Sequence, residues 1–110
     1  MDLGTLKVAL SAGRVIITQH ADRETKAELL NLTEVRASVI TGGEIIEDYP
    51  TDRRGPSCLI LSILPDGRPV HSCWGYQTVI SFATLITVYR PDLQPHKWSP
   101  DWRTRTGAIL

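Results

Sequence analysis

The sequence predicts an α+β fold in which two or three N-terminal helices pack on a four-stranded antiparallel sheet, followed by a short C-terminal helix or tail. The prediction rests on a change of period along the chain. Apolar residues recur at helical spacing before residue 43, whereas from residue 44 they follow the extended pattern of strands. The length of 110 residues suits one domain, covering residues 1–110.

The N-terminal part is expected to hold a helix, a short strand and a second helix. One face of the first helix carries Leu3, Leu6 and Leu10. Gly13 ends that helix, and the β-branched residues 14–18 favour a short strand. Thr18 then provides a side-chain cap for a helix over residues 19–29.

A third helix is expected over residues 33–41. Thr33 is its expected N-cap, and its buried stripe consists of Val35, Val39 and Ile40. The pair Gly42-Gly43 ends the helix, because glycine adopts the left-handed conformation there at little cost.

The second half of the chain is expected to form an antiparallel meander. Its four strands are predicted at residues 44–49, 57–64, 69–76 and 79–89. Residues 51–56 form a loop, and Asp66-Gly67 forms a two-residue turn that pairs Pro65 with Arg68.

This register divides the side chains between two faces of the sheet. The apolar face carries Leu59, Leu61, Ile63, Val70, Ser72 and Trp74, and the other carries Cys58, Ile60, Ser62, His71 and Cys73. The last strand adds to the apolar face Ile80, Phe82, Ile86 and Val88. That choice requires an odd-length connection or a bulge, and it places Thr87 and Tyr89 beside His71.

The charges are balanced overall but unevenly distributed. There are 12 basic and 12 acidic side chains, a net charge of zero that argues against a whole-surface nucleic-acid binder. Residues 1–50 hold 5 basic and 8 acidic side chains, whereas residues 51–110 hold 7 and 4. The first half is therefore acidic and the second half basic.

The composition also indicates where the protein resides. With 42% hydrophobic and 22% charged residues, it is typical of a soluble globular domain. Two cysteines are too few for a secreted disulfide scaffold, and the N-terminus lacks the pattern of an export signal. No apolar run reaches the roughly 20 residues of a membrane helix. We expect a cytoplasmic protein with no membrane contact.

His20 and Arg23 form the first candidate site. Three residues apart, they share a helix face, where they could supply an acid/base group and a phosphate clamp. The alternative is a histidine at a helix start that pairs with Glu24, beside a surface arginine.

His71, together with Ser62, Thr87 and Tyr89, forms the second candidate. An imidazole titrates near neutral pH, and a tyrosine hydroxyl can donate to a developing oxyanion. The alternative is a polar patch with one buried histidine hydrogen-bonded to the backbone.

A metal site is a weaker candidate. Cys58, Cys73 and His71 would provide three soft ligands, but the close C-x-x-C spacing of metal sites is absent. We expect no metal and no cofactor, with the cysteines as small apolar residues.

The C-terminal region interleaves aromatic and basic residues. Trp98, Trp102, Arg103 and Arg105 could hold single-stranded RNA by stacking and charge; alternatively, the tryptophans pack on the sheet. Ser99-Pro100-Asp101 is a good helix start. In the loop over residues 51–56, Arg53 and Arg54 either contact phosphates or are simply solvated.

Several motifs together resemble a known family. They are Thr18-Gln19-His20-Ala21-Asp22-Arg23, Gly43-Glu44-Ile45-Ile46, Pro56-Ser57-Cys58-Leu59, Gly67-Arg68-Pro69-Val70-His71, Thr87-Val88-Tyr89-Arg90-Pro91 and the Lys97-Trp98 to Arg103 tail. From about Gly13 onward the chain is similar to a small prokaryotic family classed as a domain of unknown function, which distantly resembles RelE-type and BrnT-type toxins.

The resemblance implies a metal-independent ribonuclease with paired helices over an antiparallel sheet. Its implied catalytic residues are His20, Arg23, His71, Tyr89 and Arg90, and its implied partners are RNA and a small antitoxin-like protein. The alternative function is a non-catalytic domain that binds a protein partner or itself as a homo-oligomer.

Overall fold

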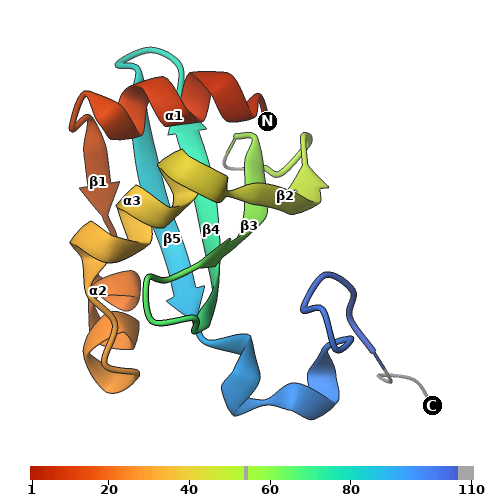
Figure 1. The fold of residues 1–110 in the computed structure, drawn as a ribbon. Helices are drawn as coiled ribbons and strands as arrows, with labels where there is room; N and C mark the ends of the chain where they lie inside the picture. Colours follow the sequence, from red (N-terminus) through yellow and green to blue (C-terminus); the bar gives the residue numbers. More distant parts are fainter. Residues whose placement is uncertain (54, 107–110) are drawn as a thin grey trace.

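The computed structural model contains a five-stranded mixed sheet in the order β1-β5-β4-β3-β2 (Figure 1). The structure describes residues 1–53 and 55–106. The strands are β1 (Val15–Ile17), β2 (Glu44–Tyr49), β3 (Ser57–Ile63), β4 (Pro69–Gln77) and β5 (Phe82–Tyr89). β1 and β5 form a parallel pair, and the other three pairs of neighbouring strands are antiparallel.

The α+β class is confirmed, whereas the prediction of four antiparallel strands is wrong. The short strand expected at residues 14–18 joins the sheet edge, because its main chain completes hydrogen bonds that β5 would otherwise lack. Ala83 N donates to Arg14 O at 2.9 Å, and Thr18 N donates to Leu85 O at 3.2 Å. The parallel direction follows from the long connection through two helices and three strands.

Three helices accompany the sheet: α1 (Leu3–Ser11), α2 (Gln19–Ala27) and α3 (Leu32–Gly42). Asp2 caps α1, and Thr18 caps α2 as predicted, accepting from Ala21 N at 3.1 Å. The cap of α3 is Asn31 instead of Thr33, with its side chain accepting from Glu34 N at 3.1 Å. Asparagine is the stronger N-cap, which explains why the helix begins earlier than predicted.

Gly43 ends α3 for a reason other than the predicted left-handed conformation. Its φ is −65°, in the extended region that any residue adopts. A Cβ at this position would lie 2.7 Å from Val39 O and 3.1 Å from Ile60 Cγ2. A side chain here would therefore collide with the main chain of the last turn of α3 and with Ile60 of β3, which is why the residue is glycine.

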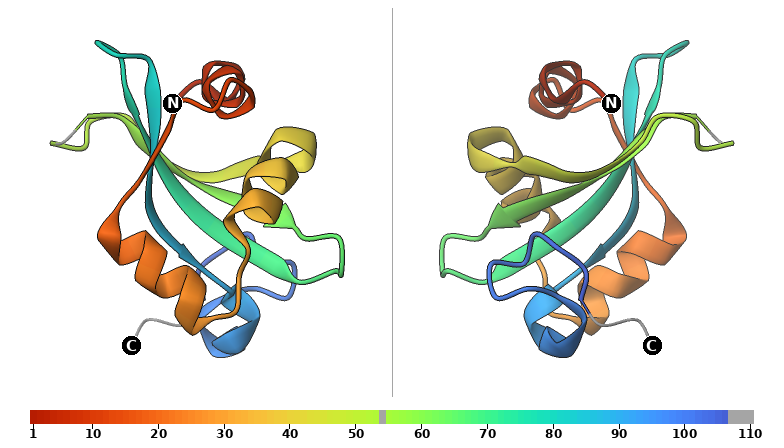
Figure 2. Two further views of the ribbon diagram at one scale, coloured as in Figure 1. Left: turned by 90° about the vertical axis from the view of Figure 1, so that its left-hand side faces the viewer. Right: turned by 90° about the vertical axis from the view of Figure 1, so that its right-hand side faces the viewer.

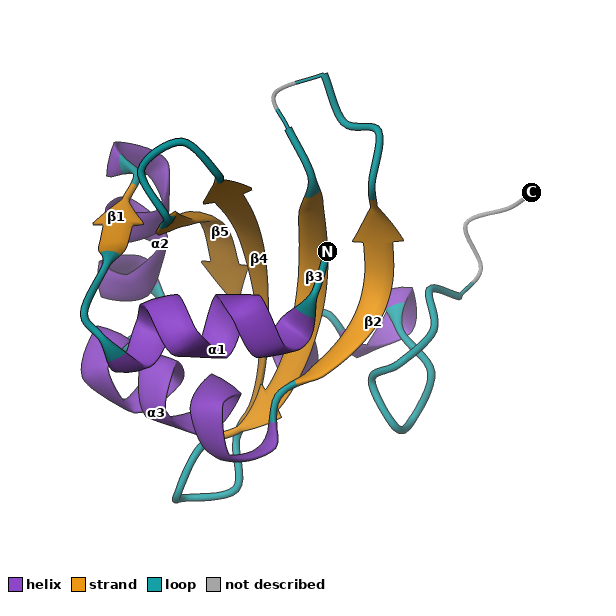
Figure 3. Ribbon diagram, turned by 90° about the horizontal axis from the view of Figure 1, so that it is seen from above, coloured by secondary structure: helices purple, strands orange, loops and turns teal. Residues whose placement is uncertain are grey.

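The sheet separates the molecule into two layers (Figure 2). Helices α1 and α3 cover one face, here called the helix face, and lie next to each other in the view from above (Figure 3). Its core contains Leu6, Leu10, Val35, Val39, Cys58, Ile60, Val70, Trp74, Leu85 and Val88. Helix α2 and residues 91–106, here called the C-terminal segment, lie on the opposite side.

The β3–β4 hairpin is shifted by one residue from the predicted register. Leu64 N donates to Arg68 O and Gly67 N donates to Leu64 O, both at 2.9 Å, so the turn contains residues 65–67. Gly67 has φ 92°. Proline favours the second position of a type I turn, and glycine then closes a three-residue loop, which is why the two-residue turn does not form.

The shift exchanges the two faces that were predicted for β3, whereas Val70 and Trp74 of β4 lie on the apolar face as predicted. Cys58 opposes Trp74 on the helix face, while Leu59 opposes Cys73 on the other. Ser62 also lies on the helix face, where it accepts a hydrogen bond from Ser38 at 2.8 Å. The predicted grouping of Cys58 and Ser62 with His71 is therefore wrong.

A bulge in β5 brings its polar residues to the predicted place. The register shifts by one residue at Ile86, so Ala83, Leu85 and Val88 are buried on the helix face. Thr87 and Tyr89 lie beside Cys73 and His71, which confirms their predicted position next to His71. The predicted core positions Ile80, Phe82 and Ile86 are wrong, because Ile80 belongs to the β4–β5 turn and the bulge falls at Ile86 itself.

The helix that was predicted to start at Ser99 does not form there, and the helical turns of the C-terminal segment lie before this residue. They are the short 3₁₀ helices η1 (Pro91–Leu93) and η2 (Pro95–Lys97). Ser99 and Asp101 instead stabilise a turn: Ser99 Oγ donates to the Asp101 carboxylate at 2.6 Å, and Trp102 N donates to Ser99 O at 2.9 Å. Across residues 1–53 and 55–106, no helix is long and apolar enough to cross a membrane.

The two adjacent glycines at the end of α3 allow a matched test of packing. We expect Gly43→Ala to lower the free energy of unfolding by about 1–3 kcal/mol, the usual cost of overpacking. Gly42→Ala meets no atom within 4 Å and is expected to be neutral or stabilising. Urea denaturation of both variants measures the difference, and equal effects would contradict the packing explanation.

Candidate functional site

The C-terminal segment folds back over the sheet face opposite α1 and α3. Trp98 and Arg105 form an isolated antiparallel bridge that closes the loop between them. Trp98 is only 5% exposed, and its ring meets the His71 ring edge-on with 4.2 Å between centroids. The burial of Trp98 therefore supports the packing role considered for it. The C-terminal segment covers this face of the sheet as a second layer.

His71 lies beneath this segment and is fully buried. Its Nε2 donates to Trp102 O at 2.8 Å, because a carbonyl oxygen can only accept. Nδ1 is therefore left to accept from the Tyr89 hydroxyl at 3.2 Å. Burial lowers the pKa of His71 from its usual value and raises that of Tyr89 to about 12. Both groups are neutral at neutral pH.

Two arginine–glutamate pairs attach the segment to β2. Arg103 Nε lies 2.7 Å from Glu44 Oε2, and Arg105 Nε lies 2.7 Å from Glu47 Oε2. Both arginines also donate a second hydrogen bond to the same carboxylate. A bulge at Ile46 makes this arrangement possible, since glutamates three residues apart would point to opposite faces of a regular strand.

Arg105 also lies over the Trp98 ring, with 4.8 Å between its guanidinium carbon and the ring centroid. Burial alone would raise the pKa of Glu47, but the hydrogen bonds from Arg105 and Tyr49 outweigh it and hold that pKa below its usual range. The RNA-contacting arginine predicted at position 103 is already paired within the chain, as is Arg90, which lies 2.9 Å from Asp92.

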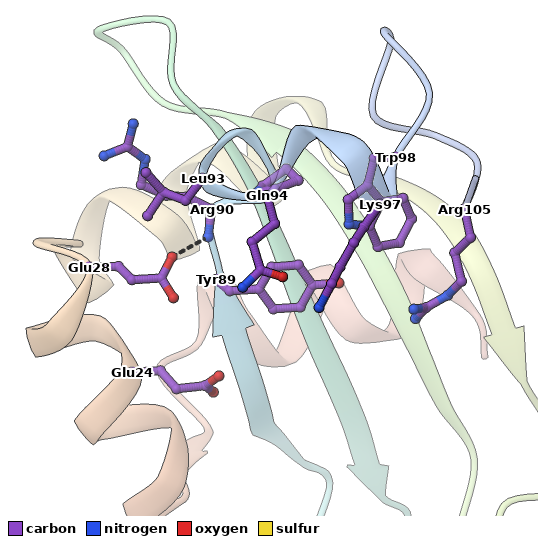
Figure 4. Close-up of a pocket in the computed structure, with 10 residues that line it drawn as sticks. Glu24, Glu28, Tyr89, Arg90, Leu93, Gln94, Lys97, Trp98 and Arg105 are labelled. Atoms are coloured by element: carbon purple, nitrogen blue, oxygen red, sulfur yellow. Dashed lines mark hydrogen bonds between the residues drawn. The ribbon is translucent and has the colours of Figure 1, made fainter. Parts of the chain in front are cut away.

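A pocket of about 550 Å³ opens between α2 and the C-terminal segment (Figure 4). Glu24 and Glu28 line one side, Lys97 and Arg105 line the other, and the ring of Tyr89 lies between them. The volume is within the range of small-molecule sites. The pocket therefore combines carboxylates, cations and an aromatic surface in one open space.

The two carboxylates are fixed in place by β5. Glu24 Oε1 accepts from Val88 N at 3.0 Å and from Thr87 Oγ1 at 2.5 Å. Glu28 Oε1 accepts from Arg90 N at 2.7 Å. Glu28 directly follows α2 and Arg90 directly follows β5, so this second glutamate–N–H pair lies just past the ends of these two elements.

His20 lies at the edge of this site. Its Nε2 is 3.2 Å from Glu24 Oε1, while the His20 side chain remains 69% exposed. The predicted pairing with Glu24 is therefore present. Arg23 is exposed on the same helix, and Arg53 is exposed in the β2–β3 loop at the other end of the sheet (Figure 1). Arg54 lies outside the described residues.

The structure brings together only some of the predicted site residues. His71, Tyr89, Trp98 and the Trp102 carbonyl meet in one cluster, whereas His20 is linked to the pocket through Glu24. Glu28 and Lys97, which line the pocket, were not among the residues predicted from the sequence. The spacing of Glu24 and Glu28 at i and i+4 on a predicted helix was the only available signal for the acidic side.

The metal arrangement considered for Cys58, Cys73 and His71 does not form. Cys58 lies on the helix face and the other two on the opposite face. Burial raises the pKa of Cys58 to about 12, so the thiol stays protonated. Among the described residues, no group of three histidine, cysteine, aspartate or glutamate side chains is placed to hold a metal ion.

One protein-family model matches the chain over residues 17–90, and its description is "Domain of unknown function (DUF4258)". The chain belongs to this family. The DUF4258 match includes His20, Glu24, His71 and Tyr89, and it stops before the C-terminal segment. No curated protein and no solved structure matches the chain. The likeness to RelE-type and BrnT-type toxins stays a prediction.

Burial of neutral His71 predicts a loss of stability in mild acid. The unfolded chain takes up a proton near the usual histidine value of 6.5, while the folded pKa is lower. The contribution of His71 to the free energy of unfolding should therefore be complete above pH 6.5. As the pH falls below 6.5, the free energy of unfolding should decrease by at most about 1.4 kcal/mol per pH unit. Urea denaturation between pH 7.5 and about 5.5 measures this slope, above the range in which carboxylates titrate.

Two variants identify the residue responsible for the slope. His71→Gln keeps a donor for Trp102 O but cannot be protonated, so its stability should be lower overall and nearly independent of pH in this window. Exposed His96→Gln should keep the wild-type slope. A slope that persists in His71→Gln would assign the effect to another group.

Proposed function

We propose that the protein is a metal-independent ribonuclease that acts at the pocket between α2 and the C-terminal segment. The observation that carries the proposal is the pairing of His20 with Glu24 at the pocket edge, where Glu24 is fixed to Val88 N and Thr87 Oγ1. A carboxylate that holds an imidazole in one orientation is the usual support of a histidine base.

In the proposed reaction, His20 is the general base. His20 donates Nε2–H to Glu24, so its Nδ1 lone pair accepts the proton of an RNA 2′-hydroxyl. The 2′-oxygen then bonds to phosphorus and the 5′-oxygen leaves, taking a proton from solvent. The products are a 2′,3′-cyclic phosphate and a 5′-hydroxyl, and no metal is needed because the nucleophile belongs to the substrate.

The surrounding residues support binding of the phosphate. Arg23 lies three residues from His20 on the exposed side of α2, and Lys97 lies across the pocket. Neither has an ion-pair partner within residues 1–53 and 55–106. His71 is assigned a structural role, because its two nitrogens are occupied by Tyr89 and Trp102. This differs from the catalytic role expected for it from the resemblance.

RNA cleavage with EDTA present tests the proposal. We expect His20→Ala to lower the rate by about 10²–10⁴-fold, the usual contribution of a general base. Glu24→Gln should also lower kcat, since Glu24 orients the His20 imidazole. His96→Ala, another exposed histidine, should be fully active. An inert wild type, or His20→Ala as active as His96→Ala, would refute the ribonuclease.

A second candidate function, self-association, is favoured by the exposed edge of the sheet. Within residues 1–53 and 55–106, β1 pairs with β5 alone, and its Ile16 and Ile17 are each 36% exposed. The β4–β5 turn places Val79, 96% exposed, near the start of β1, where Arg14 donates to Ser81 O at 2.8 Å. An apolar strand edge is a template for pairing with another chain.

Sedimentation velocity tests self-association. The wild type should form a dimer that Ile16→Lys dissociates, because a charge on an edge strand opposes pairing. Val8→Lys, at a 62% exposed apolar position on α1, is the matched control and should leave the dimer intact. A wild type that remains monomeric at high concentration would remove this candidate.

A further inference from the structure

The pocket beside α2 has walls of opposite charge. Carboxylates of Glu24 and Glu28 form one wall, and Lys97 and Arg105 form the other, with Tyr89 between them (Figure 4). A ligand that spans the pocket must therefore present hydrogen-bond donors at one end and negative charge at the other.

The carboxylates of the acidic wall act as hydrogen-bond acceptors, and main-chain N–H groups already hold them in a fixed orientation. Glu24 Oε1 accepts from Val88 N of β5 at 3.0 Å, and Glu28 Oε1 accepts from Arg90 N, directly after β5, at 2.7 Å. Their Oε2 atoms have no hydrogen-bond partner among the described residues. An ionised carboxylate has no proton to donate, so a carbonyl group placed here would be repelled, whereas an amino group would be bound.

The basic wall has one cation available for an anion. Arg105 is shared with Glu47 at 2.7 Å, whereas Lys97 is exposed and has no ion pair within residues 1–53 and 55–106. A compact ammonium group without a carboxylate partner is well suited to a phosphate.

The centre of the pocket is aromatic. Tyr89 keeps its proton, because burial raises its pKa to about 12, and its hydroxyl is held by His71 at 3.2 Å. The ring is therefore fixed in orientation. Stacking on such a ring stabilises a bound planar heterocycle, whichever hydrogen-bond donors and acceptors that heterocycle carries.

We propose that this pocket binds a nucleotide whose base carries an exocyclic amino group, with that group on Glu24 and Glu28, the base on Tyr89 and the phosphate on Lys97. The inference rests on the proposed function and deepens it, because it sets the base preference at the ribonuclease site. Cytosine and uracil differ by an amino group in place of a carbonyl oxygen, so they form the decisive pair of ligands.

Nucleotide binding is measured directly, without cleavage. Isothermal titration with CMP and UMP in EDTA should give CMP an affinity about tenfold higher, the usual effect of one well-placed base contact. Glu28→Gln keeps the bond from Arg90 N but adds an amide donor, so the preference for CMP should be reduced or reversed. AMP against IMP repeats the comparison with a purine.

Two further variants separate the ends of the ligand. Lys97→Ala should weaken CMP and UMP equally and leave cytidine, which has no phosphate, unaffected. Lys26→Ala, a lysine of α2 that pairs with Asp22 at 3.0 Å outside the pocket, should change nothing. Equal affinities for CMP and UMP, or no binding of either at millimolar concentration, would overturn the inference.

The outcome is distinguishable from that of the ribonuclease proposal. Binding that prefers CMP without RNA cleavage would retain the pocket assignment and reject the enzyme. Cleavage without a preference for CMP would retain the enzyme and reject the base specificity.

Discussion

A buried imidazole determines how the second layer of the molecule is assembled. His71 is fully buried, so both of its nitrogens need a partner inside the protein. One partner is the Tyr89 hydroxyl, and the other is the main-chain carbonyl of Trp102. The second bond brings the C-terminal segment onto the sheet and places Trp98 over the imidazole. The basic wall of the pocket is positioned by the same attachment.

The uneven charge of the chain has an internal use. Acidic residues of β2 meet basic residues of the C-terminal segment as two bidentate pairs, Arg103 with Glu44 and Arg105 with Glu47. These basic side chains of the second half are therefore neutralised by acidic side chains of the same chain, which leaves fewer cations to bind an outside ligand. At the pocket, Lys97 has no such acidic partner among the described residues. It can therefore attract an anion there although the net charge of the chain is zero.

Local signals were sufficient for most elements of the fold but insufficient for their register. The helix starts at Asp2 and Thr18 follow from side-chain caps, which involve only neighbouring residues. The register of β3 and β4 depends on whether Pro65 starts a type I turn or pairs across the strands. That choice moved the β3 residues to the other face relative to β4, because side chains alternate with a period of two.

The α+β class, the approximate positions of the helices and strands, and membership of a family of unknown function could be predicted from the sequence. Tertiary structure alone decided the bulges at Ile46 and Ile86, which select the face of each later side chain. It also decided that His71 is covered and that Glu28 faces Lys97. These depend on contacts between residues distant in the chain, and no local pattern encodes them.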